Sequence, residues 1–135
     1  MTLVLSVYHN VSSDRMRFFE GYKPEDPLTH VFDLAVPDHI DLETNYGVDT
    51  ALDYAFMALN VGHEDFAVIT DEGKANVIAY RERKNRSLSV GDVIIIDGVA
   101  FACAALGWGV VTVHPHQIIA DYAEHGTTSL DRVRF

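Results

Sequence analysis

The hydrophobic pattern along the chain is strongest in residues 86–113, RSLSVGDVIIIDGVAFACAALGWGVVTV. Within this segment the pair Asp97-Gly98 separates an apolar run at 93–96 from another at 99–101. Asp-Gly between two apolar runs is typical of a tight hairpin, because a type I′ turn needs positive φ at both central residues. The segment therefore predicts a central β-hairpin. A bend at Gly107-Trp108-Gly109 and a strand at 110–113 are expected to follow it.

Apolar residues at every second position predict further strands. The N-terminal run TLVLSVY, with Leu3, Leu5 and Val7 on one face, is the first of them. The other segments interpreted as strands are 15–22, 30–36, 66–70 and 76–83, with a turn at 71–73 before the last one.

Two segments have the periodicity of helices. Residues 47–60 place an apolar side chain at every third or fourth position, which makes one stripe: Val48, Leu52, Ala55, Phe56 and Leu59. A second helix is expected from Pro115 to about His125, because proline suits the first turn of a helix. The elements together predict a single α+β domain over residues 1–135. It has a mainly antiparallel sheet of about five to seven strands, with two helices packed on it.

The uncharged run 98–120 raises the question of a membrane span. Its strictly apolar part, 99–113, is shorter than the roughly 20 residues that a spanning helix needs. The apolar N-terminus lacks the basic leader of a signal peptide. Buried strands and a cytoplasmic protein are therefore expected, and Cys103 is interpreted as a small buried hydrophobe.

The net charge of −10 is distributed unevenly along the chain. Thirteen acidic residues and a single base, Lys23, lie between Glu20 and Glu72, whereas four cations cluster between Arg81 and Arg86. So acidic a segment disfavours direct binding to nucleic acid and favours a basic protein partner. The candidate partner-binding residues are Asp38, Asp41, Glu43, Asp49, Asp53, Arg81, Arg83 and Arg86. The alternative for the cations is a solvated segment neutralised by the chain's own acids.

Histidines near the C-terminus suggest a metal site. His114, His116, Asp121 and His125 have ligand chemistry, and His39 or Asp41 could complete the set. The alternative is that they are ordinary surface residues at the ends of a helix, since their spacing matches no zinc motif.

Signatures of catalysis are weak. Ser87, Ser89 and Cys103 lack the surroundings of a nucleophile, and Gly107-x-Gly109 lacks the third glycine and the helix of a phosphate loop. No catalytic residue and no cofactor are assigned, and the balance favours a non-enzymatic protein.

A recognisable cassette runs from Tyr80 through Arg86-Ser-Leu-Ser-Val-Gly-Asp-Val-Ile94, then Asp97-Gly98, a strand and Gly107-Trp108. It resembles a family of small uncharacterised proteins carried by actinobacterial phages and plasmids, and more distantly the YodL-type domain. The resemblance covers about residues 78–111. It implies an accessory protein of a mobile element in a bacterial cytoplasm, and it carries no catalytic residue over to this chain.

Three hypotheses follow. The first is an interaction protein that binds and modulates a host protein, such as a defence or DNA-handling factor, through an acidic face that mimics nucleic acid. The second is a self-associating module that pairs through hairpin surface around Phe101 and Trp108. The third is a small metal-binding or hydrolytic protein that uses the C-terminal histidines.

Overall fold

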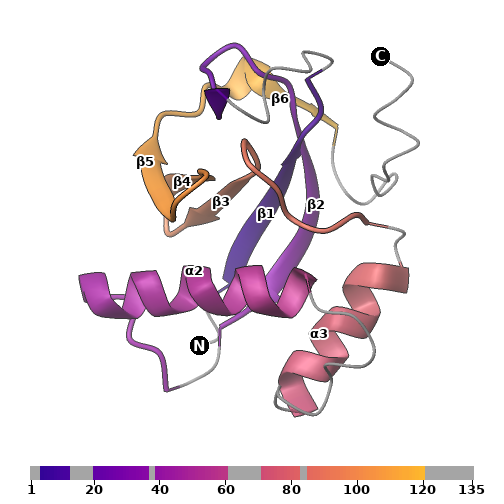
Figure 1. Ribbon diagram of the computed structural model, residues 1–135, viewed down its shortest axis with the longest axis vertical. Coiled ribbons are helices and arrows are strands. Elements are labelled where there is room, and N and C mark those ends of the chain that lie inside the picture. Colours follow the sequence, from indigo (N-terminus) through magenta and orange to yellow (C-terminus); the bar gives the residue numbers. More distant parts are fainter. Residues whose placement is uncertain (1–3, 13–19, 37–38, 61–70, 83–84, 121–135) are drawn as a thin grey trace.

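The computed structural model describes residues 4–12, 20–36, 39–60, 71–82 and 85–120 (Figure 1). Within these ranges the elements are β1 (Val4–Asn10), β2 (Leu28–Ala35), α2 (Asn45–Asn60), α3 (Asp71–Glu82), β3 (Val93–Ile96), β4 (Val99–Cys103), β5 (Trp108–Val111), a 3-10 turn at Pro115–Gln117, and β6 (Ile118–Ala120). The predicted α+β class is confirmed, with six strands and two α-helices in the described part of the chain.

The strands form one curled sheet in the order β5-β4-β3-β1-β2-β6. Neighbouring strands are antiparallel except for β2 and β6, which are parallel. The central hairpin is confirmed: Ile96 pairs with Val99, and both turn residues have positive φ, 48° at Asp97 and 82° at Gly98. The uncharged run 98–120 supplies β4, β5 and β6. No helix among the described residues is long and apolar enough to cross a membrane.

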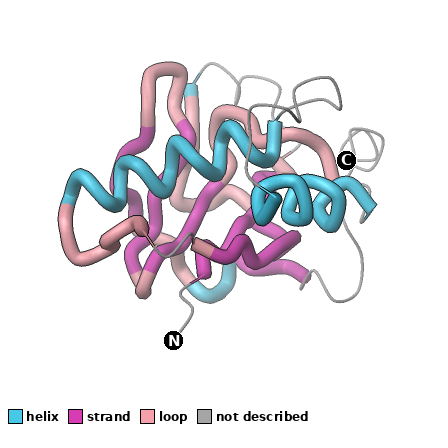
Figure 2. Tube along the Cα trace, turned by 90° about the horizontal axis from the view of Figure 1, so that it is seen from below, coloured by secondary structure: helices cyan, strands magenta, loops and turns pink. Residues whose placement is uncertain are grey.

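The main core lies between α2 and one face of the sheet. Figures 1 and 2 show α2 lying across the strands, with α3 beside one end of it. The core side chains come from β1, β2, β3 and both helices, and include Leu5, Val7, Val31, Leu34, Ile94, Leu52, Leu59 and Tyr80. Burial of Leu52, Ala55 and Leu59 agrees with the predicted stripe of α2, but Phe56 is 42% exposed. Ala51 and Ala58 are buried instead.

The opposite face of the sheet carries a smaller apolar cluster around Leu28, Val93, Ala100 and Ala102. The segment 112–117, which we call the strap, continues from β5 to β6. The Tyr22 hydroxyl donates to the carbonyl of Thr112 (2.7 Å) and contacts Oε1 of Gln117 (3.0 Å). The Gln117 amide, which is buried, donates to the carbonyl of Asp26 (2.9 Å).

The predicted strand at 76–83 and turn at 71–73 are wrong, because this segment forms α3. A strand would place Ile78 and Tyr80 on the same face, whereas Tyr80 is fully buried and Ile78 is 45% exposed. Two residues apart on a helix point about 200° apart, which separates these side chains. The acidic Asp71-Glu72 pair in the first turn also favours a helix at this position.

The helix predicted from Pro115 stops after one 3-10 turn, so this prediction is also wrong over 118–120. Gln117 is held by Tyr22 and Asp26, and the β-branched Ile118 pairs with Leu28 of β2. The bend predicted at 107–109 is confined to the preceding turn, since Trp108 and Gly109 already belong to β5. The strand predicted at 66–70 and the residues after Ala120 lie outside the described ranges, as does most of 15–22.

Candidate functional site

The basic segment contains a buried ion pair between Arg86 and Asp92. The Arg86 guanidinium donates from both Nη atoms to the two carboxylate oxygens, each at 2.6 Å. Asp92 is fully buried, and the Arg86 side chain is 9% exposed. Burial alone would raise the pKa of Asp92, but the charge of Arg86 and its hydrogen bonds hold it below its ordinary value. Arg86 is therefore committed inside the fold and does not present its charge to a partner.

Asp92 also orders the backbone on either side of it. Its carboxylate accepts hydrogen bonds from the amides of Asn10 and Ser89, both at 2.8 Å. The Asn10 side chain donates in turn to Asp26 (2.8 Å) and to the carbonyl of Gly91 (3.1 Å). The Arg86-to-Asp92 part of the cassette thus ties the end of β1, the turn before β2 and the start of β3 together.

A second chain of hydrogen bonds fixes α3 to this network. The Tyr80 hydroxyl donates to the carbonyl of Arg86 (2.5 Å) and lies 2.5 Å from Nε2 of His9. Since the hydroxyl hydrogen points to the carbonyl, Nε2 of His9 carries a hydrogen and donates to the Tyr80 oxygen. Burial raises the pKa of Tyr80 far above its ordinary value, so the hydroxyl stays protonated. This network is a structural anchor for α3.

Arg81 is also used internally. Its guanidinium donates to the carbonyls of Leu59 (3.0 Å) and Asn85 (3.1 Å) and to Oγ of Ser87 (2.8 Å). Arg83 lies outside the described ranges. Of the three proposed partner-binding cations, the two that are described, Arg81 and Arg86, make hydrogen bonds within the chain; Arg86 is buried rather than solvated, and Arg81 bonds carbonyls and a hydroxyl rather than an acid.

The proposed acidic residues lie on and before α2. Asp41, Glu43, Asp49 and Asp53 are all exposed, and Asp38 lies outside the described ranges. Thr44 caps the helix, because its Oγ1 accepts from the amide of Gly47 (2.9 Å). This cap moves the start of the helix ahead of the predicted residue 47.

The approach to α2 is tightly built. The Asp41 carboxylate accepts from the amide of Glu43 (2.9 Å), and its carbonyl accepts from Oγ1 of Thr44 (3.1 Å). A Cβ at Gly47 would lie 1.6 Å from the Asp41 carbonyl oxygen, so only glycine fits there. The loop that presents Asp41 and Glu43 is therefore fixed to the first turn of the helix.

The solvent side of α2 combines acidic and large apolar side chains. We call Tyr46, Asp49, Asp53, Phe56 and Met57 the outer stripe; they recur at three- and four-residue spacing and so share one face. Tyr46 is 77% exposed, Phe56 42% and Met57 38%. The helix contains no lysine, arginine or histidine, so no ion pair within it neutralises the carboxylates. Sequence reasoning missed this combination, because it placed Phe56 in the core.

Hollows flank the two ends of the outer stripe. Near the start of α2, a hollow of about 430 Å³ is lined by residues 39–41, Thr44, Tyr46, Gly47 and Thr50. Near its end, a hollow of about 300 Å³ lies between α2 and the β4–β5 turn. We call the second one the Trp108 hollow.

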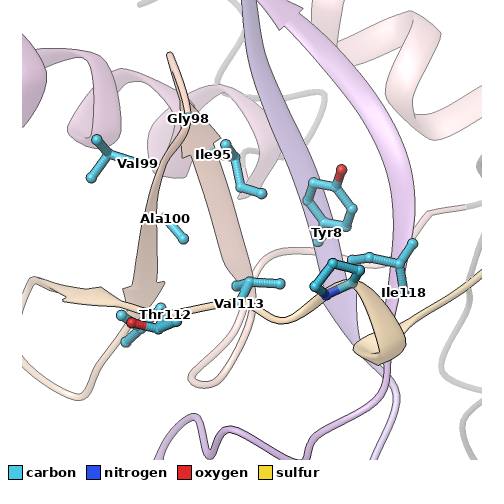
Figure 3. Close-up of a pocket in the computed structure, with 10 residues that line it drawn as sticks. Tyr8, Ile95, Gly98, Val99, Ala100, Thr112, Val113 and Ile118 are labelled. Carbon is cyan, nitrogen blue, oxygen red and sulfur yellow. The ribbon is translucent and has the colours of Figure 1, made fainter.

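A third hollow, of about 450 Å³, lies on the face of the sheet opposite α2 (Figure 3). Side chains of Tyr8, Ile95 and Ala100 surround it together with the strap, and Val99 lies at its edge. Most of the side chains that line it are apolar, and Tyr8 and Thr112 add polar groups. The Tyr8 ring also stacks on His30, with ring centroids 4.8 Å apart, and His30 pairs with Asp33 at 2.7 Å.

The predicted metal ligands are only partly described. His114 and His116 are exposed, and their rings stack with centroids 5.6 Å apart. Asp121 and His125 lie outside the described ranges. Within those ranges no group of three or more His, Cys, Asp or Glu side chains is arranged to hold a metal ion.

Cys103 is buried, as predicted, at 4% exposure. Burial, together with the negative charge of Asp92, raises the pKa of its thiol to about 11. The thiol therefore stays protonated near neutral pH, which removes the nucleophilic form.

Phe101 and Trp108, proposed for self-association, are half-buried and pack against the main core. The most exposed apolar side chains near them are Leu106 (95%) and Val110 (71%).

Comparison of the chain with protein-family models, with curated proteins and with solved structures finds no match.

Proposed function

We propose that this protein is a non-enzymatic accessory protein of a phage or plasmid that binds and modulates a host protein. The outer stripe of α2, with the exposed acids before it, is the proposed binding surface, and the partner is a protein with a basic face. The observation that carries the proposal is the exposure of Tyr46, Phe56 and Met57 beside Asp49 and Asp53. Large apolar side chains among carboxylates are typical of an interface that buries apolar area while charge directs the approach.

Charge supports a basic partner. The chain carries −10 overall, and Arg81 and Arg86 are held by internal hydrogen bonds. A surface of this kind attracts cations over a distance of about one Debye length, roughly 8 Å at physiological salt. The same attraction explains how nucleic-acid mimicry would work: carboxylates occupy a basic partner site that otherwise binds phosphates.

A pull-down from bacterial lysate at low and at moderate salt tests the proposal. The wild-type protein is compared with the double variant Tyr46→Ala/Asp49→Lys, which removes an aromatic ring and reverses a charge on the outer stripe. Glu25→Lys is the matched control: Glu25 is exposed and precedes β2, whereas the loop to α2 leaves from the other end of that strand.

The expected result is a protein that wild type and the Glu25 variant both retain at low salt, that moderate salt weakens, and that the double variant loses. Capture that is indifferent to salt, equal capture by the double variant, or no captured protein at either salt would contradict the proposal.

A further inference from the structure

The Trp108 hollow joins the end of the outer stripe to the sheet. Asp53, Phe56 and Met57 of α2 line one side of it. Cys103, Trp108 and residues of the turn between β4 and β5 line the other. Cys103 pairs with Trp108 across the two strands, and the amide of Ala104 donates to the carbonyl of Gly107 (2.9 Å), which closes the turn. These contacts join the ends of β4 and β5 at this wall of the hollow.

The chemistry of this hollow is that of an acid beside aromatic and apolar groups. Asp53 is exposed and is the only carboxylate among the described residues of the lining, while Trp108 and Phe56 supply aromatic rings and Met57 a thioether. Carboxylate and aromatic face together are a receptor for a cation, because the ring quadrupole and the negative charge act in the same direction.

Other ligands fit this lining less well. A purely apolar side chain would remove water from Asp53 without giving it a partner, which costs free energy. A phosphate or carboxylate would meet like charge. A metal ion needs more ligands than one carboxylate, and the Cys103 thiol is held protonated by burial.

We propose that the Trp108 hollow receives an arginine side chain of the basic partner protein. This inference rests on the proposed function and names the contact that the outer stripe makes. Arginine is favoured over lysine because the planar guanidinium can stack on an indole or phenyl ring and still form two parallel hydrogen bonds to a carboxylate. Its aliphatic stem would cover Phe56 and Met57, which are now partly exposed.

Trp108 is the sole tryptophan of the chain, so the tryptophan fluorescence of the folded protein comes from a residue that lines this hollow. The test titrates the protein with three blocked tripeptides that differ only in the central residue: arginine, lysine or citrulline. Citrulline keeps the shape of arginine but removes its charge. Arginine is expected to give a saturable change in the Trp108 emission, lysine a weaker one, and citrulline none.

Two matched variants locate the contact. Asp53→Asn is expected to weaken arginine binding about tenfold, as for loss of one charge-assisted contact. Glu25→Gln, at an exposed position before β2 that does not line the hollow, removes the same charge and is expected to change the affinity less than about twofold, because exposed charges are well screened. Equal responses to arginine and citrulline, or equal affinities of the two variants, would overturn the inference.

The outcome can be separated from that of the pull-down. A host protein that is lost from the Tyr46→Ala/Asp49→Lys variant, together with no arginine response at Trp108, leaves the proposed function standing and refutes the arginine contact. An arginine response without any captured protein refutes the proposed host partner and keeps the site.

Discussion

Replacement of Asp92 by asparagine changes one atom type at the centre of the buried network. The new amide keeps the shape of the carboxylate but leaves the Arg86 guanidinium without its counter-charge. Asp92 compensates the charge of Arg86, because its carboxylate accepts from both Nη atoms. The buried Nε of Arg86 has no hydrogen-bond partner in the described part of the chain. One carboxylate oxygen also becomes an NH₂ group that faces the donors from Arg86 and from Asn10 or Ser89.

The expected cost follows from this geometry. Breaking a buried pair by removing one partner destabilises a protein by about 3–5 kcal/mol. The free energy of unfolding of a small domain is about 5–15 kcal/mol, so the variant should still fold but with much reduced stability. With a urea dependence of about 2 kcal/mol per M, the unfolding midpoint should fall by about 2 M.

Urea titration followed by Trp108 fluorescence measures this shift. The control is Asp97→Asn in the hairpin turn, an exposed position where asparagine also tolerates the positive φ of 48°. It should stay within about 0.5 kcal/mol of wild type. If Asp92→Asn unfolds within about 1 kcal/mol of wild type, the ion pair does not stabilise the fold and the reasoning is refuted.

The pH dependence gives an independent check. The pKa of Asp92 is lowered in the folded protein from its ordinary value of 3.8. The stability that the pair contributes is therefore fully present above that pH, and it is lost as the pH falls through the folded pKa. Wild type should lose stability in this acid range more steeply than Asp92→Asn does; parallel curves would contradict the assignment.

Two further predictions concern the neighbouring groups. Tyr80→Phe removes the hydroxyl that His9 and the Arg86 carbonyl share, and should lower the free energy of unfolding in urea by about 1–3 kcal/mol. Tyr54→Phe, at a residue that is only half-buried, is the comparison. A smaller loss of stability at position 80 than at position 54 would argue against the anchor. Cys103, with a thiol pKa raised to about 11, should react with a maleimide far more slowly in the folded protein at pH 7 than after unfolding in urea, and similar rates would show that the thiol is accessible and ionised.

The sequence by itself determined the elements whose signals are local. Asp97-Gly98 specifies its turn because few residues accept positive φ, and the apolar runs beside it specify the two strands. The spacing of Leu52, Ala55 and Leu59 located α2, because a helix repeats every 3.6 residues whatever it packs against. The concentration of acids before and within α2 was likewise evident without a structure.

Only the tertiary structure decided the elements and sites that depend on distant partners. Apolar and polar residues alternate in 76–83 well enough to predict a strand. In the fold this segment is a helix, which buries Tyr80 against His9, 71 residues away. Gln117 ends the helix expected after Pro115 by bonding to Asp26, 91 residues away. The sequence suggested that Arg86 was a surface charge, whereas in the fold it pairs with Asp92 and donates to the carbonyl at the end of β1.

The candidate binding surface divides in the same way. Its acids were predicted from composition, because exposed carboxylates need no partner. Its apolar part was not predicted, because Phe56 fits a helical stripe by spacing. In the fold Ala51 and Ala58 are buried instead, and Phe56 faces outward. The Trp108 hollow brings Asp53 together with a residue 55 positions later, and no local pattern encodes that contact.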